Sequence, residues 1–263
     1  MPISSAGLGS GLDVSGIVSQ LMQLERQPLT ALGKKEAGLQ AKLSAYGSLK
    51  GALSAFQGTM RGLASLTRFQ ALKTSVADST ILSASAAAGA VPGGHSVEVK
   101  QLAQAHTLNS KVFANTTDTV GTGTLTVQYG TYSGSFTANA DKASQTVTIG
   151  SGQSTLGGIR DAINAANIGV TATILNDGTG NRLVLVSKDT GAANSLKITV
   201  SNDGDSDNVN DAGLSQLAYD PAGSLGNGKN LSQSVAAQNA TLKIDGIDNI
   251  SKASNTVTDA IQG

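Results

Sequence analysis

The chain has 263 residues, no cysteine, no tryptophan and a formal net charge of zero. Without cysteine it has no disulfide scaffold, thiolate metal site or cysteine nucleophile, and without a run of 18 apolar residues it is predicted not to span a membrane. Aromatic residues are only 3 % and glycines number 32, which favours a core of Val, Ile, Leu and Ala between tight turns.

The first predicted element is a helix that begins after Asp13, a residue type suited to capping a helix N-terminus. Apolar side chains follow at spacings of three and four residues, at Val14, Ile17, Val18, Leu21 and Leu24. Pro28 is predicted to end this helix and to open a second one. We therefore expect residues 1–28 to comprise a flexible N-terminus and a first helix.

The second predicted helix, within a segment of residues 29–78, carries the strongest periodic pattern in the chain. Its apolar residues follow a spacing close to a heptad repeat, with one short step between Tyr46 and Leu49. They are Leu32, Leu39, Leu43, Tyr46, Leu49, Leu53, Phe56, Met60 and Leu63. Several glycines interrupt it, each costing about 1 kcal/mol relative to alanine, so this helix needs a packing partner.

No second long heptad segment follows residue 75. The helical part is therefore predicted to be half of a coiled coil or helical bundle, completed by other subunits or by a helix beyond Gly263. The alternative is that the stripe folds back on the rest of the chain. The predicted packing residues are Ile17, Leu21, Leu24, Leu39, Leu43, Tyr46, Leu53, Phe56 and Met60.

Charge is unevenly distributed along the chain. Residues 25–75 contain eight basic and two acidic side chains. A basic helix can bind nucleic acid, but these charges are scattered, with one adjacent pair at Lys34 and Lys35. A solvated face or a match to an acidic partner helix is the favoured interpretation, and no nucleic-acid partner is predicted.

From Ser79 onwards the pattern changes to strands of alternating polarity. We expect strands at 96–100, 124–129, 146–149, 169–174, 196–200 and 241–245, and a more central one at 182–186. Residues 176–180, Asn-Asp-Gly-Thr-Gly, indicate a hairpin turn. One helix interrupts the strands, with Ser154 as its expected N-cap and Leu156, Ile159, Ile163 and Ala166 on its apolar face.

These elements predict an α+β multidomain chain, with long N-terminal helices followed by β-rich domains. We expect residues 79–119 and 231–263 to form one β-rich domain. Residues 120–230 would form an inserted α+β domain with a strand–helix–strand unit, including a long loop at 203–228.

Candidate chemical sites are weak. The two histidines, His95 and His106, have no ligand partner at helical spacing, so surface or turn positions are expected. The glycine-rich residues 7–12 follow no strand and lack the remainder of a nucleotide-binding motif. Residues 203–207 resemble the start of a calcium loop, but Asn208 and Leu214 occupy positions that require Gly and Glu. We therefore predict no catalytic, cofactor or metal site, and no enzyme.

Three stretches carry a family resemblance. Residues 4–14, 17–22 and 25–29, SSAGLGSGLDV, IVSQLM and ERQPL, closely resemble the N-terminus of bacterial flagellar filament cap proteins, the hook-associated protein 2 family. Residues 154–164, followed by 169–172 and the strand at Arg182, resemble an internal repeat of flagellar axial proteins. Residues 240–247 and 254–263 are similar to the cap family's return into its core.

The resemblance implies an extracellular protein at the filament tip, exported without a cleaved signal, which fits the absence of a signal pattern in residues 1–7. It implies a homo-oligomeric ring with helical legs and a β-rich plate, whose partners are flagellin and hook–filament junction proteins. Because family members continue beyond a motif like Asn255–Val257, we expect the C-terminal part to be missing here.

Two alternatives stay open. The β-rich part could be an adhesin for host mucin or surface glycans, with residues 203–228 and the strand turns as contact loops. No aromatic platform for a sugar is evident, since only Tyr129, Tyr132 and Phe136 cluster. The chain could also be another flagellar axial protein, a flagellin or hook–filament junction protein.

Overall fold

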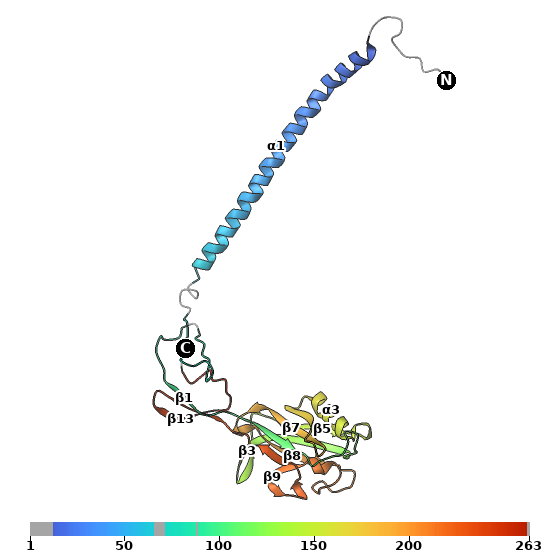
Figure 1. Cartoon of the computed structure of the whole chain (residues 1–263), viewed down its shortest axis with the longest axis vertical. Coiled ribbons are helices and arrows are strands. Elements are labelled where there is room, and N and C mark those ends of the chain that lie inside the picture. Colours follow the sequence, from blue (N-terminus) through green and yellow to red (C-terminus); the bar gives the residue numbers. More distant parts are fainter. Residues whose placement is uncertain (1–12, 66–71, 88, 262–263) are drawn as a thin grey trace, which may run out of the picture. The chain divides into compact units, whose positions relative to one another are not determined.

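A computed structural model describes residues 13–65, 72–87 and 89–261 (Figure 1). The chain divides into two compact units. One comprises residues 1–74 and 85–89 and contains the long helix, and the other comprises residues 75–84 and 90–263 and contains the strands. An α+β chain with a long N-terminal helix and a β-rich remainder is thereby confirmed.

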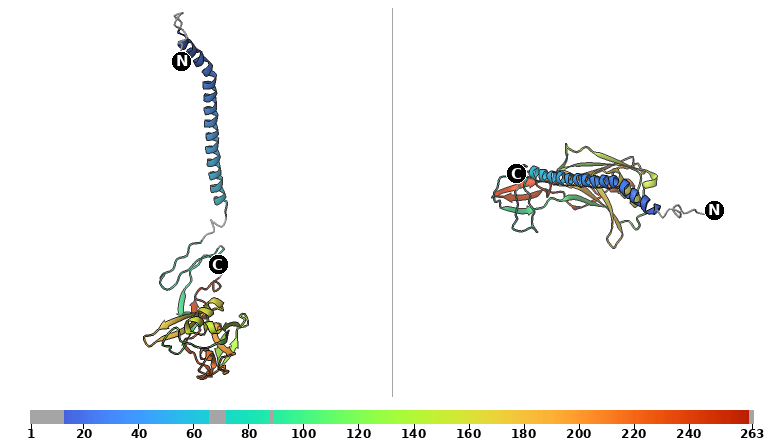
Figure 2. Two further views of the ribbon diagram at one scale, coloured as in Figure 1. Left: turned by 90° about the vertical axis from the view of Figure 1, so that its right-hand side faces the viewer. Right: turned by 90° about the horizontal axis from the view of Figure 1, so that it is seen from above.

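The N-terminal helix α1 runs without a break from Val14 to Leu63. Asp13 caps it as predicted, its carboxylate accepting hydrogen bonds from the Gly16 N–H at 2.9 Å and the Ser15 hydroxyl at 2.7 Å. The predicted division at Pro28 is wrong, because Pro28 lies inside α1. A proline removes one backbone donor and bends a helix, and the strong helix formers on either side continue it. Figure 2 shows α1 bending in its N-terminal part.

The strands form three antiparallel sheets. The first has the order β1-β12-β13, the second β11-β2-β7-β6, and the third β10-β9-β8-β3-β4, with β5 also paired to β3. Their bounds are β1 Val97–Gln101, β2 Ala105–Asn109, β3 Gly123–Ser133, β4 Ser135–Ala138, β5 Gln145–Ile149, β6 Val170–Asn176, β7 Asn181–Thr190, β8 Ser195–Ser201, β9 Tyr219–Ser224, β10 Asn227–Lys229, β11 Ser232–Val235, β12 Ala240–Ile244 and β13 Ile247–Lys252.

The alternating pattern predicted these strands well where it was strong. β3 pairs with β8 over seven residues, from Thr124 opposite Ser201 to Gly130 opposite Ser195. The predicted hairpin joins β6 to β7, with Asn176 opposite Asn181. In its turn, the Asp177 carboxylate accepts from Arg182 Nε at 2.7 Å and from the Thr179 N–H at 2.9 Å. The more continuously apolar strand, β7, is central in its sheet as expected.

The helix α3, Leu156–Ala166, confirms the predicted interruption of the strands. Its N-cap is Thr155 rather than Ser154. The Thr155 hydroxyl accepts a hydrogen bond from the Gly158 N–H at 3.1 Å, whereas the Ser154 hydroxyl donates to the Ser151 carbonyl in the preceding 3₁₀ helix η1, Ser151–Gln153. Because the Ser154 hydroxyl is bonded to the preceding 3₁₀ helix, Ser154 does not cap α3, and the cap is the next residue, Thr155.

The core lies between the second and third sheets and includes the inner face of α3. Its most buried side chains are Leu108, Leu125, Ile149, Leu156, Ile159, Ile163, Leu183, Leu185, Leu196, Ile198, Leu214 and Leu217. No Trp or Phe is among them, as the composition predicted. The three-stranded sheet stands outside this core and buries only Ala240 and Ile244 of its strand residues.

Two short strands that lie just outside the predicted insert belong to the same sheet as two strands inside it. β2 and β11 are hydrogen-bonded neighbours, and β2 pairs with β7. The division into 79–119 plus 231–263 and 120–230 stays a prediction. It cuts across this sheet, because β2 and β11 are sequentially outside residues 120–230 and structurally joined to them.

The predicted loop at 203–228 contains more structure than expected. A 3₁₀ helix η3, Leu214–Leu217, is followed by β9, and Leu214, Leu217 and Tyr219 are buried. Asp203 is buried as well and accepts from the backbone N–H groups of Leu214 and Ser215 at 3.1 and 2.6 Å. Asp203, the first residue of the acidic run, therefore satisfies backbone N–H groups at the start of a buried turn of helix.

Candidate assembly surface on the long helix

All nine predicted packing residues lie on α1 and are exposed. Their exposed fractions range from 45 % for Ile17 to 69 % for Tyr46, and α1 has no buried residue. Leu29, Leu32, Leu49 and Leu63 on the same helix are equally exposed. So many exposed large apolar side chains on one element are unusual for a free surface and typical of an interface.

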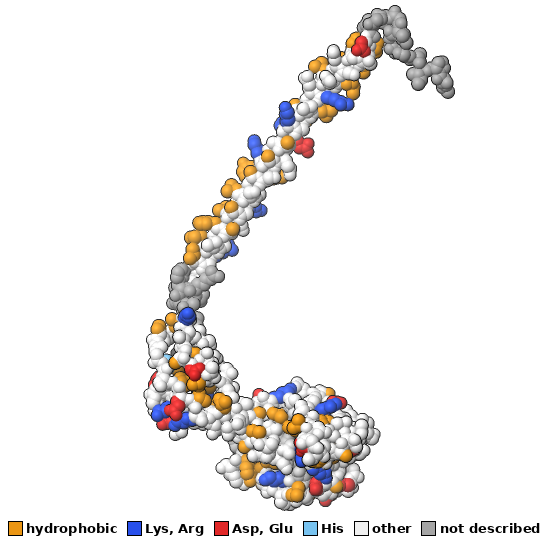
Figure 3. Space-filling view, in the orientation of Figure 1, with side chains coloured by type: hydrophobic (Ala, Val, Ile, Leu, Met, Phe, Trp, Pro, Cys, Tyr) orange, Lys and Arg blue, Asp and Glu red, His pale blue; other side chains and the backbone are white. Residues whose placement is uncertain are grey.

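The arrangement of these side chains follows the repeat in the sequence. In Figure 3 hydrophobic side chains form a band along the C-terminal half of α1, with Lys and Arg on the other edge in this view. A narrow apolar seam beside charged flanks is the pattern of a helix that packs against another helix.

The glycines of α1 leave open space along the helix. A Cβ atom added at Gly33, Gly38, Gly47, Gly51 or Gly58 would meet no atom within 4 Å, other than neighbours along the chain and the helix's own nearby backbone. Because glycine is unfavourable inside a helix, and nothing in the described chain fills this space, these positions favour close approach of another helix.

The start of α1 is electrostatically suited to its cap. The pKa of Asp13 lies below its ordinary value, chiefly because its carboxylate accepts the Gly16 backbone hydrogen bond. An ionised carboxylate also interacts favourably with the positive end of the helix dipole.

The histidines differ from one another, and only one matches its expected setting. His95 is exposed and lies 2.7 Å from the Asp245 carboxylate. His106 is not a surface or turn residue: it is 2 % exposed, in β2. Its Nδ1 accepts from the Leu196 N–H at 2.8 Å and its Nε2 lies 3.0 Å from Gln233 Oε1. No local pattern in the sequence predicts this link between β2, β8 and β11.

The other candidate sites contain no reactive cluster. Among residues 13–65, 72–87 and 89–261, no group of three His, Cys, Asp or Glu side chains could hold a metal ion. Over the same residues no helix is long and apolar enough to cross a membrane. Asp205 and Asp207, in the segment that resembles a calcium loop, form hydrogen bonds with neighbouring loop groups.

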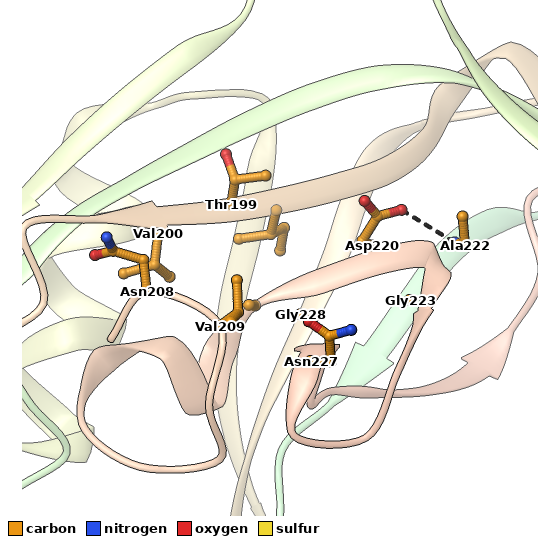
Figure 4. A pocket seen from close by; sticks show the side chains of 11 residues that line it. Thr199, Val200, Asn208, Val209, Asp220, Ala222, Gly223, Asn227 and Gly228 are labelled. Atoms are coloured by element: carbon orange, nitrogen blue, oxygen red, sulfur yellow. Dashed lines mark hydrogen bonds between the residues drawn. The ribbon is translucent and has the colours of Figure 1, made fainter. Parts of the chain in front are cut away.

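A shallow pocket lies between β8, the β9–β10 hairpin and the loop at 208–209 (Figure 4). Val200, Val209 and Gly228 line it, and Asp220 at its edge accepts from the Ala222 N–H at 3.0 Å. Of the three aromatic residues that cluster in the sequence, Tyr129 is buried and donates its hydroxyl to the Ile168 carbonyl.

Comparison with known proteins bears on the whole chain. The family model described as "Flagellar hook-associated protein 2 N-terminus" matches residues 10–106, and "Flagellin hook IN motif" matches residues 124–189. The flagellar hook-associated protein 2 of Escherichia coli K12 is 39 % identical over 261 residues, which is 98 % of this chain and 51 % of that protein.

Solved structures agree with these matches. The D1-D2-D3 domains of the E. coli flagellar cap protein FliD superpose with a TM-score of 0.70 at 38 % identity, covering 84 % of this chain and 57 % of that one. The D2-D3 domains of the E. coli protein give a TM-score of 0.56 at 37 % identity, covering 68 % of this chain and 82 % of theirs. This chain belongs to the flagellar hook-associated protein 2 family.

Family membership confirms the resemblance carried by the three stretches, although residues 4–12 and 262–263 lie outside the described structure. The chain spans about half the length of the curated relatives that it matches most fully.

Proposed function

We propose that this chain is part of a cap at the tip of the bacterial flagellar filament, where it assists the insertion of flagellin subunits. The observation that carries this proposal is the exposed apolar seam of α1, with all nine predicted packing residues at least 45 % exposed. Such a seam suits a protein whose helical part is completed by assembly. The names of the relatives, cap protein and hook-associated protein, support the same role.

The proposed partners are further copies of the chain in a ring, flagellin, and the hook–filament junction proteins beneath the filament. The proposed location is extracellular, at the filament tip, after export without a cleaved signal. The β-rich unit contributes the stable part of such a subunit, because it has its own core. The helix contributes the surface that packs.

The test introduces a charge into the seam of the full-length protein in its bacterium. Leu43→Asp and Leu53→Asp each place a carboxylate where an apolar contact is expected. Ser44→Asp and Ser54→Asp are matched controls, because each adds the same residue to α1 next to a seam position. We expect short or absent filaments and a smaller oligomer mass for the two leucine variants only. Normal filaments and unchanged mass for Leu43→Asp and Leu53→Asp would refute the role of the seam.

A further inference from the structure

The strand β6 lies at one edge of the second sheet, where β7 is its paired neighbour. It is the longest edge strand in the described chain, and its seven residues pair with β7 in one continuous register. Its sequence, Val-Thr-Ala-Thr-Ile-Leu-Asn, is rich in β-branched residues and contains no charge. A long, regular and uncharged edge is one on which a further strand pairs easily.

The other edge strands have features that discourage such pairing. β1 contains Glu98 and Lys100, and β13 contains Asp248 and Lys252. β10 and β11 have three and four residues and irregular registers, and β4 and β5 have four and five residues. Charges, short length and bulges are the usual means of protecting an edge. β6 has none of them.

The backbone groups of every second residue of β6 point away from β7. The Lys188 N–H donates to the carbonyl of Gly169, just before the strand, at 2.9 Å. Odd-numbered positions therefore face β7, and the N–H and C=O groups of positions 170, 172, 174 and 176 face the open edge. Ala172 lies near the middle of this row.

The side chain of Asn164, on α3, occupies the open edge at Ala172. Its Nδ2 donates to the Ala172 carbonyl at 2.8 Å, and its Oδ1 accepts from the Ala172 N–H at 2.8 Å. One side-chain amide thus makes both hydrogen bonds that a residue of a neighbouring strand would make. Between Ala172 and the end of the strand at Asn176, only Ile174 has backbone groups that face the open edge. A single residue is shorter than the strands that pair in proteins.

The connection from α3 to β6 brings Asn164 to this position. Asn167 follows α3 in the left-handed conformation, with a φ of 48°, and Gly169 has a φ of 78°. A Cβ atom at Gly169 would lie 2.5 Å from the Tyr129 hydroxyl oxygen, so glycine is required there. The same hydroxyl donates to the Ile168 carbonyl and holds the turn. The chain therefore returns alongside the last turn of α3, and its eighth residue after Asn164 meets the amide.

A second asparagine makes the same pair of bonds away from any strand edge. The Asn255 Oδ1 accepts from the Ala103 N–H at 2.7 Å, and its Nδ2 donates to the Ala103 carbonyl at 3.0 Å. Ala103 lies between β1 and β2 and belongs to neither. Removing the Asn255 amide therefore breaks an equal set of hydrogen bonds without opening an edge, which makes Asn255→Ala a matched control.

We propose that the edge of β6 is a pairing surface for β6 of a second copy of this chain, and that the Asn164 side chain keeps it closed. The strand suits a copy of itself, because an antiparallel pair of two uncharged, regular edges is self-complementary and opposes no like charges. This inference goes beyond the proposed function and does not depend on it, because it concerns a contact that the folded chain prevents.

Amide hydrogen exchange of the 263-residue chain tests the closure. The Ala172 N–H, bonded to Asn164, should exchange more slowly than the Ile174 N–H, which faces the open edge. Asn164→Ala should make the exchange at Ala172 roughly fivefold faster, as expected for the loss of one hydrogen bond, and alanine preserves the helix. Equal rates at Ala172 and Ile174 in the parent chain would overturn the closure assigned to Asn164.

Sedimentation velocity tests the consequence in the same chain. Asn164→Ala should sediment as a larger species than the parent chain at equal concentration, and exchange at Ala172 and Ile174 should slow as the concentration rises. Any association through α1 is common to all variants. Asn255→Ala should sediment as the parent chain does. Adding Thr173→Lys to Asn164→Ala places a charge on the exposed face of β6 and should restore the sedimentation of the parent chain.

Two further substitutions separate edge closure from general destabilisation. Asn164→Ser, whose short side chain cannot make both bonds, should associate as Asn164→Ala does. Asn164→Asp keeps an acceptor for the Ala172 N–H, loses the donor and adds a negative charge at the edge, so it should weaken the contact without causing association. Unchanged sedimentation of folded Asn164→Ala and Asn164→Ser would overturn the proposal. Association of Asn164→Asp, or failure of Thr173→Lys to suppress association, would do the same.

Discussion

Acidification should weaken the β-rich unit through one buried side chain, His106. Its Nδ1 faces the Leu196 N–H, a donor, so Nδ1 must be the unprotonated nitrogen and Nε2 carries the hydrogen that reaches Gln233. The ring also lies edge-on to Tyr219, with centroids 5.5 Å apart. A second proton would therefore convert an acceptor into a donor that points at another donor.

The direction of the effect follows from burial. Burial lowers the pKa of His106 below 6.5, and the Gln233 hydrogen bond opposes this only in part. In the unfolded chain histidine titrates near 6.5, so below this pH the unfolded state binds a proton that the folded state does not. The stability contributed by neutral His106 is complete above about pH 6.5 and is lost as the pH falls towards the folded-state value, with a slope approaching about 1.4 kcal/mol per pH unit.

The assay is urea unfolding of the chain, followed by far-ultraviolet circular dichroism and tyrosine fluorescence, at intervals between pH 7.5 and 5. His106→Asn keeps a polar side chain and removes the titration. The other titratable groups are the same in both chains, so the difference between the two slopes isolates His106. Equal slopes for the parent chain and His106→Asn would refute the role assigned to this side chain, whatever the absolute stability of the variant.

Three further changes should separate the two units. Leu183→Ala removes a side chain that is fully buried in β7 and should lower the free energy of unfolding by about 2–5 kcal/mol. Its control, Leu175→Ala, removes a side chain that is 58 % exposed and should change the free energy of unfolding by less than about 0.5 kcal/mol. Similar urea midpoints for the two variants would contradict the assigned core. Asp203→Ala leaves two buried backbone N–H groups at the start of η3 without their acceptor, which should lower the free energy of unfolding by roughly 1–3 kcal/mol for each group. The control Asp211→Ala, in the same loop, loses only an exposed ion pair with Lys111, worth at most about 1 kcal/mol. Asp13→Ala removes the cap of α1 and should destabilise its start, seen as faster amide exchange in the first turn with no change in the urea midpoint of the β-rich unit.

Local pattern predicted the elements whose stability is decided locally. The apolar period in α1 and the alternation in β3, β6, β8 and β12 are visible without knowledge of their neighbours. Pro28 misled the prediction, because a proline cost of about 3 kcal/mol is small against dozens of residues that continue the helix. Whether the helix continues through Pro28 depends on the stability of the whole helix rather than on one residue.

Elements whose inward side is polar or interrupted were missed. In β2 the two inward residues are His106 and Leu108, so a histidine stands where the alternation calls for an apolar residue. β9 contains Pro221 and Gly223 and pairs with β8 only at Tyr219. Both strands depend on partners distant in the chain, Gln233 for His106 and Ile198 for Tyr219, and no local signal specifies them.

The two units therefore differ in where their apolar side chains lie: they are buried in the β-rich unit and exposed on α1. The β-rich unit buries its own, and its buried histidine, His106, has hydrogen-bond partners. In α1 every large apolar side chain from Val14 to Leu63 is exposed, and glycines such as Gly33, Gly38 and Gly47 each cost about 1 kcal/mol of helix stability. Because a long helix with these costs gains stability mainly from packing, its helical content should rise with protein concentration while the β-rich unit stays unchanged. Association would then be the step that completes the folding of α1, which is the property required of a subunit that becomes ordered only on joining its neighbours.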